Sequence, residues 1–120
     1  MPGARGEATI QAGEREVHIL FTNRALADAE AQIGKSIIGI AQGFAEGTTG
    51  VGDIAHLLRA GMEAARRDAR AGGKVVTLND AFQVLDEADF TAVSVAVMEA
   101  VSAVLSFTGD EVPNAGAGSG

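Results

Sequence analysis

The 120-residue sequence contains no cysteine, no tryptophan and no tyrosine, and only two prolines. The absence of cysteine excludes disulfide bonds and thiol catalysis, and it agrees with a protein of the cytosol. Residues 1–13 lack the apolar segment of a signal peptide, so we expect no secretory leader and a cytoplasmic location. The length suits one domain of ordinary size.

Basic residues are missing from the last third of the chain. All nine Lys and Arg residues occur up to Lys74, whereas seven acidic residues and no basic ones follow it. The net charge of −7 argues against a general nucleic-acid-binding protein, because phosphate contacts require clustered Lys and Arg. The C-terminal third therefore predicts an acidic surface, suited to a basic partner or simply to solubility.

Hydrophobic spacing predicts an α+β fold that is mainly α. Apolar side chains alternate over 7–12 and 15–21, which is the pattern of a β-hairpin with one buried face. Two strands alone are only marginally stable, so this N-terminal hairpin should pack on helices. Helical spacing and end signals predict a bundle of about five helices, at 24–33, 36–45, 53–71, 81–87 and 89–108.

The expected organisation is a single globular domain at 7–108. A lead-in at 1–6 and a tail at 109–120 are rich in glycine and proline and have no apolar pattern, so we expect a flexible lead-in and a disordered tail. Within the domain, Gly72-Gly73 predicts the end of one long helix. The segment 77–80 has the form of a capping box that starts the next helix.

The predicted helix at 89–108 organises the rest of the fold. Only Glu99 is charged between positions 90 and 107, and the polar side chains gather in one narrow stripe. The run is shorter than the ~20 apolar residues of a membrane span. A helix this apolar must be covered by the rest of the domain or by a partner chain. Glu99 should reach water along the stripe, or else pair in an interface with Arg66, Arg67 or Arg70.

The apolar helix faces supply candidate residues for binding a partner protein. The helix predicted at 53–71 carries one apolar face, and the helix at 89–108 is apolar on most sides. Burial in the domain's own core would produce the same pattern, so both interpretations stay open. The hypothesised partner-binding residues are Leu57, Gly61, Met62, Val97 and Val101.

Patterns for catalysis, cofactors or metals are incomplete. Gly34-Lys35-Ser36 resembles the end of a phosphate-binding P-loop, but Ala29 stands where that motif needs glycine. Asp53 and His56 share a helix face, yet no second pair of metal ligands is found. We therefore expect no enzyme, no cofactor and no metal site, and we interpret three acidic residues as helix-terminus charges: Asp86, Glu87 and Asp89.

A series of packing and turn segments runs from residue 5 to residue 107. These segments are Arg5-Gly6-Glu7, Phe21-Thr22-Asn23, Ala25-Leu26 with Glu30, Ile33-Gly34-Lys35-Ser36-Ile37, Asp53-Ile54, Leu57-Leu58, Ala60-Gly61-Met62 and Thr77-Leu78. In these segments the chain resembles the small tail protein family of gene transfer agents and tailed phages. Members are described as tail assembly chaperones and sometimes as tail tube proteins.

The resemblance implies a non-enzymatic role in tail morphogenesis. Similar proteins are thought to coat the long helical tape measure protein and hand it to tail tube subunits, so the expected partners are the tape measure protein and the tail tube protein. A homo-oligomer is a further possibility, and neither nucleic acid nor membrane is an expected partner. Two alternatives stay open: a structural tail tube subunit, present in a virion-like particle, and a helical adaptor that homodimerises.

Overall fold

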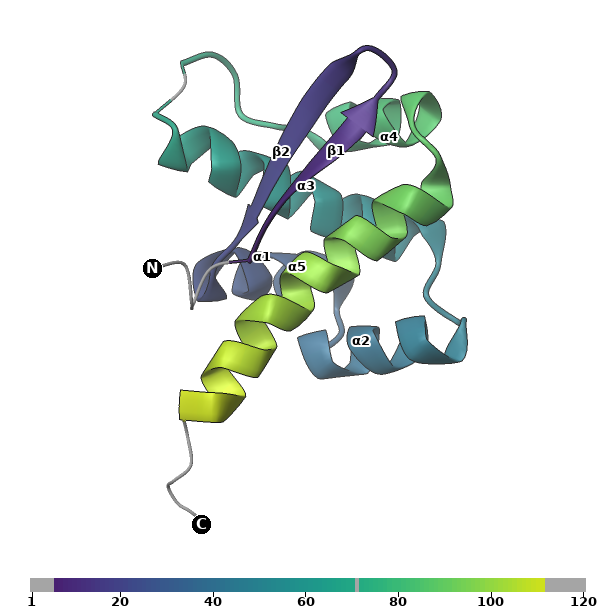
Figure 1. Cartoon of the computed structure of the whole chain (residues 1–120), viewed down its shortest axis with the longest axis vertical. Helices are drawn as coiled ribbons and strands as arrows, with labels where there is room; N and C mark the ends of the chain where they lie inside the picture. Colours follow the sequence, from purple (N-terminus) through teal and green to yellow (C-terminus); the bar gives the residue numbers. More distant parts are fainter. Residues whose placement is uncertain (1–5, 71, 112–120) are drawn as a thin grey trace.

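The computed structural model describes residues 6–70 and 72–111, with side chains up to residue 105. It has the predicted α+β, mainly α architecture, an N-terminal antiparallel hairpin followed by five helices (Figure 1). The elements are β1 (Gly6–Ala12), β2 (Arg15–Phe21), α1 (Asn23–Ile33), α2 (Ile37–Glu46), α3 (Val51–Asp68), α4 (Leu78–Glu87) and α5 (Phe90–Glu111).

The hairpin is closed by the two-residue turn Gly13-Glu14. Ala12 lies opposite Arg15, and Gly13 has a φ of 63°, as the first central residue of a type II′ turn requires. The register places the alternating apolar residues of both strands on one face. That face carries Ile10 and Val17 as directly opposed neighbours, and both are buried.

Two helices cover the apolar face of the hairpin. Helix α3 contacts β2 and helix α5 contacts β1, so the core lies between the sheet and these two helices (Figure 1). Glycine permits both close approaches. A side chain at Gly61 of α3 would press on Phe21 and Ile19 of β2, and a side chain at Gly6 would collide with the backbone of Ala100 in α5.

Local end signals start and stop most of the helices. The Thr22 side chain accepts a hydrogen bond from an N–H of the first turn of α1, and Gly34 ends that helix in the left-handed conformation. Thr77 and Asp80 form the predicted capping box of α4. The Asp89 carboxylate accepts a hydrogen bond from a backbone N–H in the first turn of α5, which is the helix-terminus role expected of it.

Several predicted boundaries differ from the structure: α3 begins at Val51 and α4 at Leu78, two and three residues before the predicted starts. Helix α3 ends at Asp68, before Gly72-Gly73, and Arg70 adopts a φ of 55° in the connection. Gly6 is the first residue of β1 and not part of a lead-in. Residues 109–111 belong to α5 and not to a tail. The remaining expectations for the lead-in and the tail concern residues 1–5 and 112–120, which lie outside the described residues.

Among the described residues, no helix is long and apolar enough to cross a membrane.

Candidate functional site

The five hypothesised partner-binding residues lie in or beside the core. Leu57, Val97 and Val101 have no exposed surface. Gly61 is also buried, against the side chains of Phe21 and Ile19. Met62 alone is half-buried. The structure therefore packs Leu57, Gly61, Val97 and Val101 inside the domain, and only Met62 retains exposed surface.

A small apolar groove lies between α2 and the first turns of α5. We call it the α2–α5 groove, with a cavity of about 230 Å³. Phe44 of α2 and Ile54 of α3 form part of its wall, and Phe90 and Val95 of α5 form another part. Phe90 is 38% exposed and Val95 is 42% exposed. The other lining residues are Gly47, Thr49, Thr91 and Ser94, so none of the groove's lining residues is charged.

Ser94 gives the α2–α5 groove one polar feature. The residue is 5% exposed, and its Oγ has no hydrogen-bond partner among the described residues. A buried hydroxyl without a partner is unfavourable, because it has lost its bonds to water without replacing them. The groove therefore offers apolar contact, and its wall contains one buried hydroxyl without a partner among the described residues.

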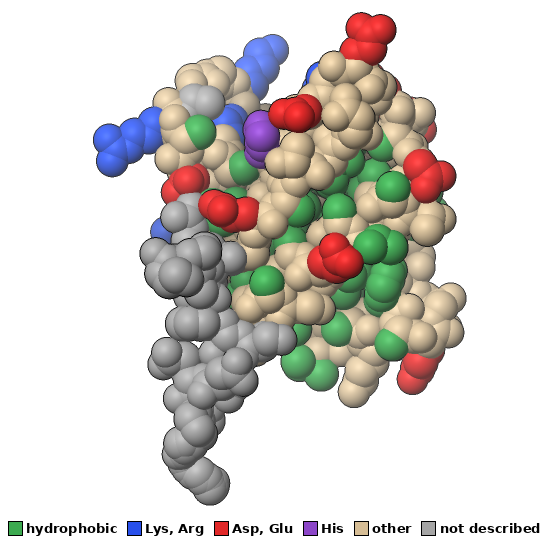
Figure 2. All heavy atoms as spheres, viewed as in Figure 1, with side chains coloured by type: hydrophobic (Ala, Val, Ile, Leu, Met, Phe, Trp, Pro, Cys, Tyr) green, Lys and Arg blue, Asp and Glu red, His purple; other side chains and the backbone are tan. Residues whose placement is uncertain are grey.

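Acidic side chains surround this apolar region. Glu46 precedes groove residue Gly47 in the chain, Asp89 precedes Phe90, and both acids are exposed. Figure 2 shows hydrophobic side chains grouped beside α5 with Asp and Glu side chains around them, while Lys and Arg side chains gather toward the upper left. The face around the groove is thus apolar at its centre and negative at its margin.

Glu99 lies on the outer side of α5 and is exposed, as expected for an acid on the polar stripe. Two of the three arginines considered as its partners bind another acid instead. Arg66 and Arg67 both pair with Glu63, each at an N–O distance of 2.7 Å. Glu99 therefore belongs to the solvated surface of α5.

Glu63 is the buried charge of this fold, and its side chain is 6% exposed. Its carboxylate accepts two hydrogen bonds from Arg66, one from Arg67, and one of 2.9 Å from the backbone N–H of Val76. The hydrogen bonds from Arg66 lower the pKa of Glu63 most, and with the Val76 and Arg67 bonds they outweigh burial, so the pKa is about 2. The cluster fastens the connection between α3 and α4 to α3.

Neither histidine lies in a metal site, and none of the described residues form a cluster of three or more potential ligands. His18 is exposed on β2 and shares a 3.3 Å hydrogen bond with Thr9 of β1. Asp53 lies in the first turn of α3 and pairs with Lys35 at 3.1 Å. Lys35 is thus an exposed residue of the α1–α2 turn.

The sequence patterns predicted neither the ion-pair cluster of Glu63 nor the α2–α5 groove. Glu63 could have been found, because Arg66 and Arg67 follow it at the i+3 and i+4 positions where helical side chains meet. The α2–α5 groove could not, because Phe44 and Phe90 come from distant segments and no local pattern links them.

No family model, no curated protein and no solved structure matches this chain.

Proposed function

We propose that this chain is a non-enzymatic tail morphogenesis protein of a gene transfer agent or phage-like particle, acting as a tail assembly chaperone that binds the tape measure protein. The resemblance of its packing and turn segments to that family supports the proposal. The structural observation that carries it is the α2–α5 groove, where Phe90 and Val95 are exposed and the acidic residues Glu46 and Asp89 adjoin lining residues in the chain.

The groove suits an amphipathic helix as its ligand. A helix that inserts apolar side chains beside Phe90 and Val95 would remove exposed hydrophobic surface from water. Lys or Arg side chains at the edge of such a helix would meet the acidic margin of the face. A tape measure protein is long, helical and apolar, so repeated segments of it could each bind one copy of the chain.

Co-expression with the tape measure protein tests the proposal. We expect more soluble tape measure protein and a complex that is captured through a tag on this chain. If its solubility is unchanged and no complex is captured, the chaperone function is wrong. Polymers of the chain alone, seen by size-exclusion chromatography and electron microscopy, would instead favour a structural tail subunit, and a defined dimer without tape measure binding would favour a homodimeric adaptor.

Two variants test the location of the binding surface. Val95→Lys places a positive charge in the groove and should weaken capture of a basic helix at least tenfold, because apolar contact is lost and like charges meet. Ala103→Lys adds the same charge to another exposed position of α5, about two helical turns away. It should bind as the wild type does. Equal weakening by both variants would place the binding surface outside the α2–α5 groove.

A further inference from the structure

Strand β2 has an open outer edge. In a hairpin closed by a two-residue turn, Ala12 and Arg15 form a hydrogen-bonded pair, and the pairs alternate from there along the ladder. The N–H and C=O groups of Glu16, His18 and Leu20 consequently point away from β1. The sheet has two strands, and no other backbone group of the described residues bonds to this edge.

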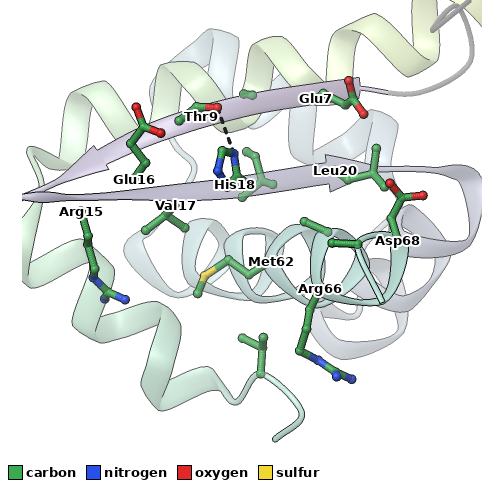
Figure 3. Close-up of a pocket in the computed structure, with 15 residues that line it drawn as sticks. Glu7, Thr9, Arg15, Glu16, Val17, His18, Leu20, Met62, Arg66 and Asp68 are labelled. Atoms are coloured by element: carbon green, nitrogen blue, oxygen red, sulfur yellow. Dashed lines mark hydrogen bonds between the residues drawn. The ribbon is translucent and has the colours of Figure 1, made fainter. Parts of the chain in front are cut away.

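A long groove follows this edge. Its cavity is about 880 Å³, and it is lined along β2 by every residue from Arg15 to Leu20. The opposite wall consists of Met62, Ala65, Arg66 and Asp68 in the second half of α3, of Ala69 directly after that helix, and of Val76 in the following connection. Glu7, Ala8 and Thr9 of β1 also line the cavity. Figure 3 shows Val17 and Met62 pointing into the space between β2 and α3, with Glu16 and His18 on the other side of the strand. We call this cavity the β2-edge groove.

We propose that the β2-edge groove binds one extended segment of another polypeptide, which adds to the hairpin as a third strand. The bound segment would hydrogen-bond to the free backbone groups of Glu16 and His18, the two exposed residues of this edge, whereas Leu20 is buried. Its alternate side chains would lie over Met62, Ala65 and Val76, the apolar part of a wall that also carries Arg66 and Asp68. The addition would convert a marginal two-stranded sheet into a three-stranded one.

Charge and shape select the kind of segment. Glu16 is exposed and has no ion-pair partner among the described residues, whereas Arg15 already pairs with Glu87. A basic side chain on the added strand, directly across from Glu16, would supply that partner. The occupant is therefore a strand of alternating residues, apolar toward α3 and polar or basic on the other side.

A second copy of the chain fits this groove less well. Pairing β2 with β2 of a second copy would place both α3 helices on the same face of one continuous sheet. In each copy the second half of α3 already forms the wall of the groove beside β2, so the two helices would compete for the same space. A single extended segment carries no helix with it and avoids this conflict.

Amide hydrogen exchange measured by NMR tests the proposal, with an octapeptide of sequence Thr-Val-Lys-Val-Thr-Val-Lys-Val as the probe. The peptide should slow exchange at Glu16 and His18 about tenfold at a concentration ten times its Kd. Val17 and Ile19 should change little, because their N–H groups already bond to β1. A peptide with proline in place of both threonines should protect less, since proline cannot complete the ladder.

Two variants of the full chain complete the test. His18→Pro removes an N–H that the hairpin does not use and should weaken peptide binding about tenfold or more. Thr9→Pro, directly opposite on β1, makes the same change at the other edge and should bind normally. Ala65→Arg places a large side chain in the groove and leaves the sequence of β2 unchanged, so it should also weaken peptide binding. This variant tests the proposal even if the proline variants do not fold.

The proposal is wrong if the peptide gives no protection at Glu16 and His18, or if Ala65→Arg leaves that protection unchanged. It is also wrong if protection rises with protein concentration in the absence of peptide, because a second copy would then occupy the edge. Val95→Lys lies in the α2–α5 groove and should leave peptide binding at the β2-edge groove unaltered. A failure of this proposal is therefore distinguishable from a failure of tape measure binding.

Discussion

Replacing Glu63 with Gln should destabilise the protein most at neutral pH and hardly at all near pH 2. Glu63 has a pKa of about 2 in the folded protein against an ordinary value of 4.5. That difference corresponds to about 3 kcal/mol of folding free energy. Because the folded-state pKa is the lower one, this stability is present above pH 4.5 and is lost as the pH falls toward 2. Glu63→Gln should remove about 2–3 kcal/mol near pH 7.

Urea unfolding followed by far-UV circular dichroism measures this effect, since the chain has neither tryptophan nor tyrosine to serve as a fluorescence probe. The quantity to compare is the difference in unfolding free energy between wild type and variant at each pH. Glu99→Gln is the matched control, because Glu99 is exposed on α5 and its loss should cost less than about 0.5 kcal/mol. The reasoning is refuted if Glu63→Gln lowers the unfolding free energy at pH 7 by less than about 0.5 kcal/mol. It is also refuted if the difference between wild type and variant does not shrink as the pH is lowered.

Three further predictions concern packing and helix ends. Gly61→Ala should cost about 1–3 kcal/mol in urea unfolding, because its Cβ would lie 2.9 Å from the Phe21 ring; an unchanged midpoint would contradict the close crossing of α3 and β2. Thr77→Ala should cost about 1 kcal/mol by removing the capping box with Asp80, and Thr77→Ser should restore most of it. Ser94→Ala should be neutral or stabilising, because its Oγ has no partner; a loss above about 1 kcal/mol would mean that the hydroxyl is bonded in solution.

The order and type of every element could be predicted from local patterns. Alternation over two short segments predicted the hairpin, and its two-residue turn allowed one register. The segment 77–80 marked the start of α4, because the capping box of Thr77 and Asp80 is a contact between near neighbours in the chain. The end of α3 was missed because it depends on tertiary contact: Glu63 binds the backbone of Val76 and so fixes the path of the connection.

The candidate site was harder to predict than the fold. Leu57 and Val101 sit on apolar helix faces, and periodicity alone cannot distinguish a face that packs internally from one that binds a partner. The distinction depends on which apolar side chains are left uncovered once the domain has folded. Phe90 and Val95 are left uncovered in this way, and their exposure follows from the positions of α2 and α5 in the folded domain.

The contact between β1 and α5 has a consequence for biosynthesis. Gly6 packs on Ala100, so the first strand is covered by the last helix. During translation the hairpin is complete long before α5 leaves the ribosome, and its apolar face stays partly open in the meantime. Because β1 and α5 are far apart in the sequence, the packing of α5 on β1 should be a late event in folding. Nascent chains stalled before α5 should therefore be easily cleaved by proteases, and those with α5 fully emerged should resist them.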